Sequence, residues 1–214
     1  MNLNEYENLI GALEAHAPSG LHFRNSSDAH ESAVLIPLIR NADGSTSLLF
    51  EVRSSRLDAQ PGDICFPGGG IEEGETAEEA ALRETTEELL VRPDQVRILG
   101  RLDGMMGPGG GAIWPVIGEL KEYDGSFSKD EVGEVFRVPL NFFMNTEPER
   151  YGVTLVTVPD DDFPYDKING GRNYGWSKKH QTMLFFEYEN RVIWGFTARA
   201  VWRFRKFLET IPEK

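Results

Sequence analysis

The stretch "FPGGGIEEGETAEEAALRETTEELLV", from Phe66 to Val91, contains eight glutamates and one basic residue, Arg83. Thr76, followed three residues later by Glu79, is the pattern of a capping box, and the residues after it are good helix formers. The preceding Phe-Pro-Gly-Gly sequence predicts a turn, because its glycines allow unusual backbone angles. We therefore expect a glycine turn that leads directly into an acidic helix.

Three of these glutamates fall on one face of the predicted helix. Glu84, Glu87 and Glu88 are three and four residues apart, and side chains at these spacings lie next to one another. Charge runs on helices are more often solvated surfaces, so the helix alone does not define a site. The turn changes this balance, because its glycines free the Gly69 carbonyl to face the converging carboxylates. Oxygen ligands of this kind suit a hard divalent cation such as Mg²⁺ or Mn²⁺.

The overall charge limits the classes of partner. The chain has 214 residues and a formal net charge of −13, which argues against nucleic acid or an anionic membrane surface, since either would be repelled. A small polyanion remains compatible if bound cations correct the local charge. No apolar run reaches the ~18 residues of a membrane-spanning helix, and the first residues lack a secretory signal, so a cytoplasmic location is expected.

The rest of the chain alternates between predicted strands and helices. Apolar spacing predicts a helix over about residues 2–17, and Asn41 to Gly44 predicts a hairpin turn between two strands. Further strands are expected over 96–102, 112–120, 152–158 and 182–195, and a last helix over 197–211. This order predicts one α/β domain over residues 1–214. The polar segment 159–179 is expected to be a substrate-covering loop or a mobile insertion.

Over residues 69–91 the sequence resembles the Nudix box, G-x5-E-x7-R-E-U-x-E-E-x-G-U, where U is a bulky aliphatic residue. The matching positions are Gly69, Glu75, Arg83, Glu84, Glu87, Glu88 and Val91. Two positions depart from the pattern. Thr85 replaces an aliphatic residue and is expected to pack as a small side chain. Leu90 replaces the glycine that ends the helix, so we expect the helix to run on to Arg92.

The residues before the box narrow the resemblance to the coenzyme A pyrophosphatase branch of this family. The residues in register with that branch are Leu49, Arg53, Ser54, Gly62 and the run from Phe66 to Gly69. Phe50, Glu51 and Asp58 depart from it, and Asp58 puts an acid where the pattern has an arginine. Because later segments are also similar, the resemblance runs from about Ser32 to Leu208.

The resemblance implies a Nudix-type α-β-α sandwich with a mixed central sheet. It also implies hydrolysis of a small nucleoside diphosphate compound, and for this branch cleavage of coenzyme A into 4′-phosphopantetheine and adenosine 3′,5′-bisphosphate. Two alternatives stay open. One is a Nudix enzyme for another substrate, such as ADP-ribose, a nucleotide sugar or a nucleoside triphosphate. The other is a non-catalytic module that binds a nucleotide. A homodimer is an allowed assembly.

The resemblance also assigns metal-binding and catalytic residues. Glu84 and Glu88 are the expected principal ligands of Mg²⁺ or Mn²⁺. Glu87 and the Gly69 carbonyl are expected to complete the ligand set. The expected catalytic residues are Glu84, Arg83 and Glu87.

The remaining residues around the box are expected to support these ligands. Arg83 would orient Glu87 or Glu75, and Glu75 would brace the loop rather than bind the metal. The general base stays open between Glu84 and an acid outside the box. The outside candidates are Glu131 and Glu134, which are equally compatible with solvated positions.

Substrate contacts are expected from residues just before the box. Arg53 is the best candidate for a phosphate contact, because a guanidinium binds phosphate oxygens in a bidentate manner. A surface arginine in a salt bridge is an equally good interpretation of the same residue. Ser54 and Gly68 are the other expected substrate-binding residues.

Overall fold

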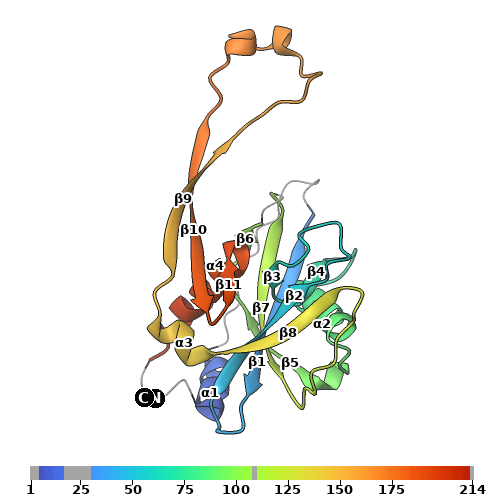
Figure 1. Cartoon of the computed structure of the whole chain (residues 1–214), viewed down its shortest axis with the longest axis vertical. Coiled ribbons are helices and arrows are strands. Elements are labelled where there is room, and N and C mark those ends of the chain that lie inside the picture. The colour runs from blue at the N-terminus through green and yellow to red at the C-terminus, as the bar shows by residue number, and fades with distance from the viewer. Residues whose placement is uncertain (1–4, 17–29, 108–109, 213–214) are drawn as a thin grey trace.

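The computed structural model describes residues 5–16, 30–107 and 110–212, and a β-sheet forms its centre (Figure 1). Hydrogen-bonded neighbours follow the order β3-β2-β1-β7-β5, while β4 pairs with β1, β6 with β7 and β8 with β2. The strands are β1 Ser32–Arg40, β2 Thr46–Arg53, β3 Ile64–Cys65, β4 Gly68–Gly70, β5 Val96–Arg101, β6 Met105–Met106, β7 Ala112–Leu120 and β8 Val132–Pro139. The strands predicted between residues 32 and 120 therefore lie in one sheet.

β1 gives the sheet its mixed character. It runs antiparallel to β2 and β4 but parallel to β7. The β1–β2 connection is the predicted hairpin, in which Gly44 has a φ of 82° that favours glycine. The pairing of β4 with β1 places Gly69 opposite Ala33. This pairing thus holds the glycine turn against β1, a largely buried inner strand of the sheet.

Helices pack on both faces of this sheet. They are α1 Tyr6–Ala15, α2 Ala77–Glu88, α3 Leu140–Asn145 and α4 Gly195–Leu208, with a 3₁₀ turn, η1, at Pro93–Gln95. Successive residues of a strand point to opposite faces. In β1, Ile36 and Leu38 join a core with α1 and α4, whereas Ala33 and Leu35 join a second core with α2. The predicted α-β-α sandwich with a mixed central sheet is therefore confirmed.

The first helix lies inside the range 2–17 predicted for it, and residues 2–4 and 17 fall outside the described part of the chain. None of the helices in the described ranges is both long and apolar enough to cross a membrane.

α2 is the predicted acidic helix and begins with the predicted capping box. The Thr76 hydroxyl accepts a hydrogen bond from the Glu79 N–H (3.2 Å), and the Glu79 carboxylate accepts one from the Thr76 N–H (2.8 Å). The helix ends at Glu88, so the prediction that it continues to Arg92 was wrong. Leu90 has a φ of 52°, the left-handed conformation in which glycine usually ends a helix. The chain thus makes the usual turn despite the leucine.

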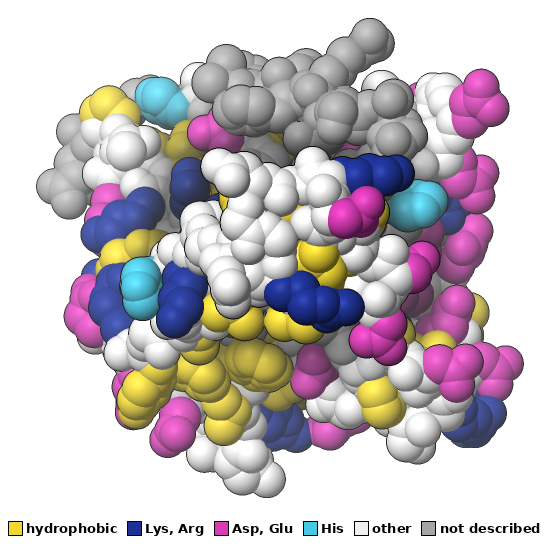
Figure 2. All heavy atoms as spheres, turned by 90° about the horizontal axis from the view of Figure 1, so that it is seen from above, with side chains coloured by type: hydrophobic (Ala, Val, Ile, Leu, Met, Phe, Trp, Pro, Cys, Tyr) yellow, Lys and Arg dark blue, Asp and Glu magenta, His cyan; other side chains and the backbone are white. Residues whose placement is uncertain are grey.

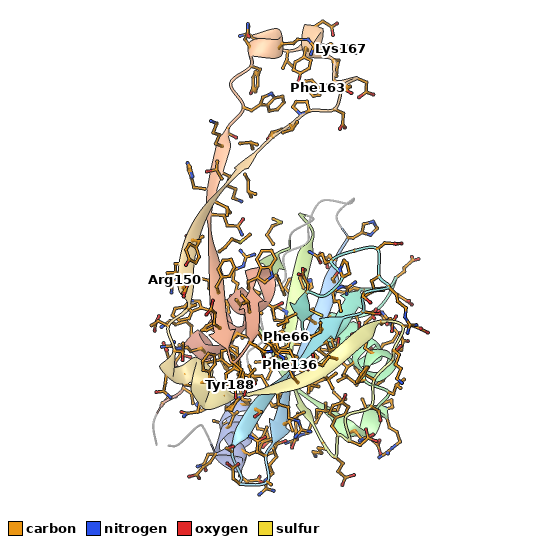
Figure 3. All side chains as sticks on the ribbon, in the orientation of Figure 1. Phe66, Phe136, Arg150, Phe163, Lys167 and Tyr188 are labelled. Carbon is orange, nitrogen blue, oxygen red and sulfur yellow. The ribbon has the colours of Figure 1, made fainter. Side chains whose placement is uncertain are left out.

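A β-hairpin arm extends from the body of the molecule (Figure 1). The arm is made of β9 Glu149–Val156 and the first part of β10 Lys178–Tyr188, and β11 Arg191–Trp194 in the body completes a second sheet in the order β11-β10-β9. Residues 157–177 form the tip, with short 3₁₀ turns η2 at Tyr165–Lys167 and η3 at Gly171–Asn173. Figure 3 places Phe163 and Lys167 at the tip, far from Phe66 in the body. The segment predicted as a substrate-covering loop or mobile insertion is therefore the end of an arm that points away from α2.

Candidate active site

Arg83 connects the turn, the following loop and the helix. Its guanidinium donates to both Glu75 oxygens (2.8 and 3.0 Å), to Glu84 Oε1 (2.8 Å) and to the Gly70 carbonyl (2.9 Å). Glu87 lies farther away, at 3.8 Å. These hydrogen bonds from Arg83, with one from the Glu72 N–H, lower the pKa of Glu75 to about 2. Arg83 therefore holds Glu75 and Glu84 directly, and Glu87 only loosely.

The Glu84 carboxylate lies against the backbone of Gly69. A β-carbon added at residue 69 would come within 2.3 Å of Glu84 Oε1, so the missing side chain leaves the space that the carboxylate occupies. This contact brings the turn and α2 together, and the role of the Gly69 carbonyl as a metal ligand stays a prediction. The space beside Gly69 thus holds a carboxylate, and carboxylate oxygens are ligands that hard divalent cations prefer.

Glu88 is the most buried carboxylate of α2, at 8% exposure. Its Oε2 accepts a hydrogen bond from the Gly68 N–H (2.8 Å). Burial raises the pKa of Glu88 to about 8, the Gly68 hydrogen bond opposes this, and the charges of Glu84 and Glu131 add to the rise. A cation at this position would remove the cost of ionising Glu88. Gly68, which the sequence predicted as a substrate contact, holds Glu88 through its backbone in this structure.

Glu87 lies at the exposed margin of the site, with 58% of its side chain accessible. Among the described residues, no group of three or more acidic, histidine or cysteine side chains is arranged as a complete cation site. The predicted convergence of Glu84, Glu87 and Glu88 is therefore only partial, because Arg83 and the Gly68 N–H engage two of the three carboxylates. The fit to a divalent cation rests on the Gly69 contact and on the buried Glu88.

Glu51 is a residue of this region that the functional interpretation of the sequence missed. It lies in β2, opposite Cys65 of β3, and is 1% exposed. Burial raises the pKa of Glu51 well above its ordinary value, and the charge of Glu88 raises it further. The available signal was a charged residue inside the apolar strand "TSLLFEVR". A charged residue inside a buried strand is expected to have a hydrogen-bond partner, an opposite charge or a metal ion beside it.

Two predicted substrate residues lie at the end of β2 and directly after it. Arg53 Nε donates to the Ala59 carbonyl (3.2 Å), and the positive charge of Arg53 acts on both Glu51 and Glu88. Ser54 is 3% exposed, and its hydroxyl accepts a hydrogen bond from the Arg56 N–H (3.4 Å). Arg53 therefore borders the site, whereas the Ser54 hydroxyl stabilises its own loop.

The two acids outside the box have different surroundings. Glu134 pairs with Arg191 of β11. Glu131 is exposed, and its charge acts on both Glu51 and Glu88. Glu131 is thus electrostatically connected to the site, whereas Glu134 is engaged elsewhere.

A hollow of about 340 Å³ lies where β2, β3 and β11 meet. Its lining includes Val52, Ile64, Glu134, Arg191 and Trp194. Trp194 is 41% exposed and stacks on Phe185, with 5.8 Å between ring centroids. The hollow therefore offers an aromatic face beside the strand that ends in Arg53.

Acidic side chains are unevenly distributed over the surface of the molecule. In Figure 2, Asp and Glu side chains gather on the right-hand side of the view, the side on which Figure 1 shows α2. An anionic substrate would be repelled there unless cations were bound.

A mixed sheet between helices, with two carboxylates of one helix held on a glycine turn, defines an α/β protein with an acidic site. The profile of the NUDIX domain matches residues 29–141. The chain therefore belongs to the Nudix family, as the resemblance predicted. Members of this family are pyrophosphohydrolases that act on nucleoside diphosphate compounds, and they generally need divalent metal ions.

Individual relatives differ in how much of their length is matched. Peroxisomal coenzyme A diphosphatase NUDT7 of Mus musculus is 36% identical over 137 residues, which cover 63% of this chain and 57% of the mouse protein. The uncharacterized Nudix hydrolase NudL of Escherichia coli O7:K1 is 35% identical over 180 residues, covering 83% and 82%. The crystal structure of the M. smegmatis Nudix hydrolase RenU has 23% identity and a TM-score of 0.46, covering 53% and 72%. The chain thus spans little more than half the length of the mouse relative.

Proposed function

We propose that this chain hydrolyses the pyrophosphate bond of coenzyme A or a coenzyme A derivative with the help of Mg²⁺ or Mn²⁺. The products would be 4′-phosphopantetheine, or its acyl form, and adenosine 3′,5′-bisphosphate. The observation that carries the chemistry is the pair of α2 carboxylates held on the glycine turn, Glu84 against Gly69 and Glu88 on the Gly68 N–H. Similarity to the mouse coenzyme A diphosphatase supports the choice of substrate.

The roles follow from these contacts. Glu84 and Glu88 would hold the cation, with Glu87 and the Gly69 carbonyl as further donors. A bound Mg²⁺ or Mn²⁺ supplies charge neutralisation at the pyrophosphate and lowers the pKa of a water nucleophile. Arg83 keeps the Glu84 carboxylate in place through their 2.8 Å hydrogen bond.

Hydrolysis adds the water oxygen to one phosphorus and breaks that phosphorus's bond to the bridging oxygen. The proton released by the water passes to a carboxylate. Glu84 is one candidate base, and Glu131 is favoured over Glu134 because its charge acts on the buried carboxylates while Glu134 pairs with Arg191. Arg53 would bind a phosphate oxygen from the end of β2.

A substrate panel tests the proposal. Coenzyme A, acyl-coenzyme A, NADH, ADP-ribose and nucleoside triphosphates would each be incubated with Mg²⁺ and with Mn²⁺, and products identified by mass. We expect the highest kcat/KM for a coenzyme A compound. A higher kcat/KM for another of these compounds would favour the alternative, a Nudix enzyme with a different substrate. Asp58, which stands where the coenzyme A branch has an arginine, motivates that alternative.

A Glu88→Gln variant separates an enzyme from a nucleotide-binding module. We expect turnover to fall by several orders of magnitude, with Glu73→Gln, an exposed residue of the same stretch, as the matched control. Absence of turnover in the wild-type protein, together with retained nucleotide binding, would support the binding module.

A cytoplasmic location and a homodimer remain proposals. Cell fractionation checks the location, and light scattering checks the oligomeric state.

A further inference from the structure

One carboxylate next to the site has no part in the roles given above. Glu51 is almost wholly buried, and its Oε1 has no hydrogen-bond partner. Among the ion pairs of the described ranges, none includes Glu51 or Glu88. A buried carboxylate oxygen without a partner is strongly unfavourable when the group is ionised, so a bound cation would offset the cost of ionising Glu51.

The backbone places Glu51 on the side of the sheet that carries α2. Alternation along β2 gives Glu51 the same face as Leu49, which packs in the core with α2. Glu51 also pairs with Cys65, one residue before the turn that begins at Phe66. The Gly68 N–H of that turn holds Glu88, so the two buried carboxylates approach from the sheet and from the helix.

Arg53 does not replace the missing group. Its charge acts on Glu51 and Glu88, but its Nε donates to the Ala59 carbonyl and it forms no ion pair among the described residues with either carboxylate. Two buried carboxylates that repel each other can share a doubly charged ion. Oxygen donors of this type select hard divalent cations.

We propose that Glu51 is a metal ligand that, together with Glu88, binds a divalent cation on the sheet side of α2. Glu51 would supply this ligand from outside the glutamate-rich helix. The inference deepens the proposed function and rests on its requirement for a cation, but it concerns metal binding and can be tested without a substrate.

Mn²⁺ binding to the full chain tests the inference. Protein freed of metal with EDTA would be titrated with Mn²⁺, and free Mn²⁺ followed by electron paramagnetic resonance. Glu51→Gln and Glu51→Met remove the carboxylate at similar length. The control is Glu119→Gln, a buried strand glutamate whose oxygens accept from Tyr6 and Arg97. We expect both Glu51 variants to bind one Mn²⁺ fewer, or about tenfold or more weakly, and Glu119→Gln to bind as wild type.

Thermal melting provides a second measurement that does not depend on turnover. In EDTA, both Glu51 variants should melt at or above the wild-type temperature, because a buried unpaired carboxylate has been removed. With Mn²⁺, the wild type should gain more in melting temperature than either variant. Unchanged Mn²⁺ stoichiometry and affinity in the variants that fold would overturn the inference, as would destabilisation in EDTA with unchanged Mn²⁺ binding.

The outcomes separate this inference from the proposed function. Glu51-dependent Mn²⁺ binding without coenzyme A hydrolysis supports the metal ligand and rejects the substrate. Coenzyme A hydrolysis with Glu51-independent Mn²⁺ binding overturns the metal ligand alone. A wild-type chain that binds no Mn²⁺ overturns the metal ligand and the cation requirement together.

Discussion

At the scale of single residues, Arg83 and Glu51 reach the site from different parts of the fold. Arg83 meets Glu75 of the preceding loop and Glu84, the next residue of α2. The partner that helical spacing predicts for Arg83 is Glu87, four residues on, and it lies farther away at 3.8 Å. Glu51 reaches the same region because β2 pairs with β3 and α2 packs on that face of the sheet. Contacts that depend on tertiary pairing do not follow from spacing along the chain. The apolar strand around Glu51 therefore predicted a core position but not a site.

Gly69→Ala tests the contact between the turn and Glu84. The added β-carbon would meet the end of a flexible side chain, so the free energy of unfolding should change by less than ~2 kcal/mol while the carboxylate moves. A displacement of the Glu84 carboxylate by about 1 Å is expected to lower kcat by about 100-fold. Gly70→Ala is the matched control, because a β-carbon there meets nothing within 4 Å. Equal turnover in the two variants would contradict this account of the site.

Glu75→Gln tests the electrostatic support that Arg83 gives the loop. The pKa of Glu75 falls from an ordinary value of 4.5 to about 2 in the folded chain, because Arg83 and the Glu72 N–H bind its charged form. A lowered pKa contributes stability that is present above pH 4.5 and is lost as the pH falls toward 2. The variant should therefore be less stable than wild type at pH 6, and the difference should shrink as the pH falls.

Urea unfolding at a series of pH values from 3 to 7 measures this difference. Glu73→Gln, an exposed neighbour, serves as the control and should follow the wild-type curve. A gap between Glu75→Gln and wild type that grows toward low pH would have the wrong sign for a carboxylate held ionised by Arg83.

At the scale of elements, the two ends of α2 differ in how well the sequence predicted them. The start was predictable because Thr76 and Glu79 are the residue types of a capping box. The end was not, because Leu90 is a residue type that disfavours the left-handed conformation it adopts. Thr85 fits as predicted: it is fully buried, and its hydroxyl donates to the Ala81 carbonyl at 2.6 Å.

Leu90→Gly should stabilise the chain. Leu90 is 60% exposed, so little packing is lost, and glycine removes the cost of the left-handed conformation. The expected gain is about 1 kcal/mol in the free energy of unfolding, measured by urea denaturation. Leu90→Ala keeps a β-carbon at the same φ and should show no such gain. A glycine variant less stable than the alanine variant would mean that the Leu90 side chain contributes more than its exposure indicates.

At the scale of the whole molecule, strand identity was easier to predict than strand pairing. The ranges of β1, β2 and β7 match apolar runs in the sequence, because a buried strand leaves that signature. The parallel pairing of β1 with β7 and the antiparallel pairing of β2 with β8 join segments far apart in the chain. The arm follows the same rule. Its two strands and the polar segment between them were predicted, but not that the strands pair into a hairpin that extends from the body.

Shortening the arm tests whether its tip serves the site. Replacing residues 157–177 by Asn-Gly would join Val156 to Lys178, which already pair, through a two-residue hairpin turn. The tip has its own aromatic cluster, in which Phe163 packs on Tyr165 and on Trp176, and it points away from α2. Its removal should therefore leave the melting temperature within ~4 °C of the wild-type value.

The same variant should keep coenzyme A turnover within about threefold of wild type, because the arm tip points away from α2 (Figure 1). Phe163→Ala combined with Trp176→Ala is the matched control, since it disrupts the cluster without shortening the chain. If the shortened arm loses turnover by more than about tenfold while the control keeps it, the backbone of the tip must reach the substrate during catalysis. The arm would then have to close over the site during turnover.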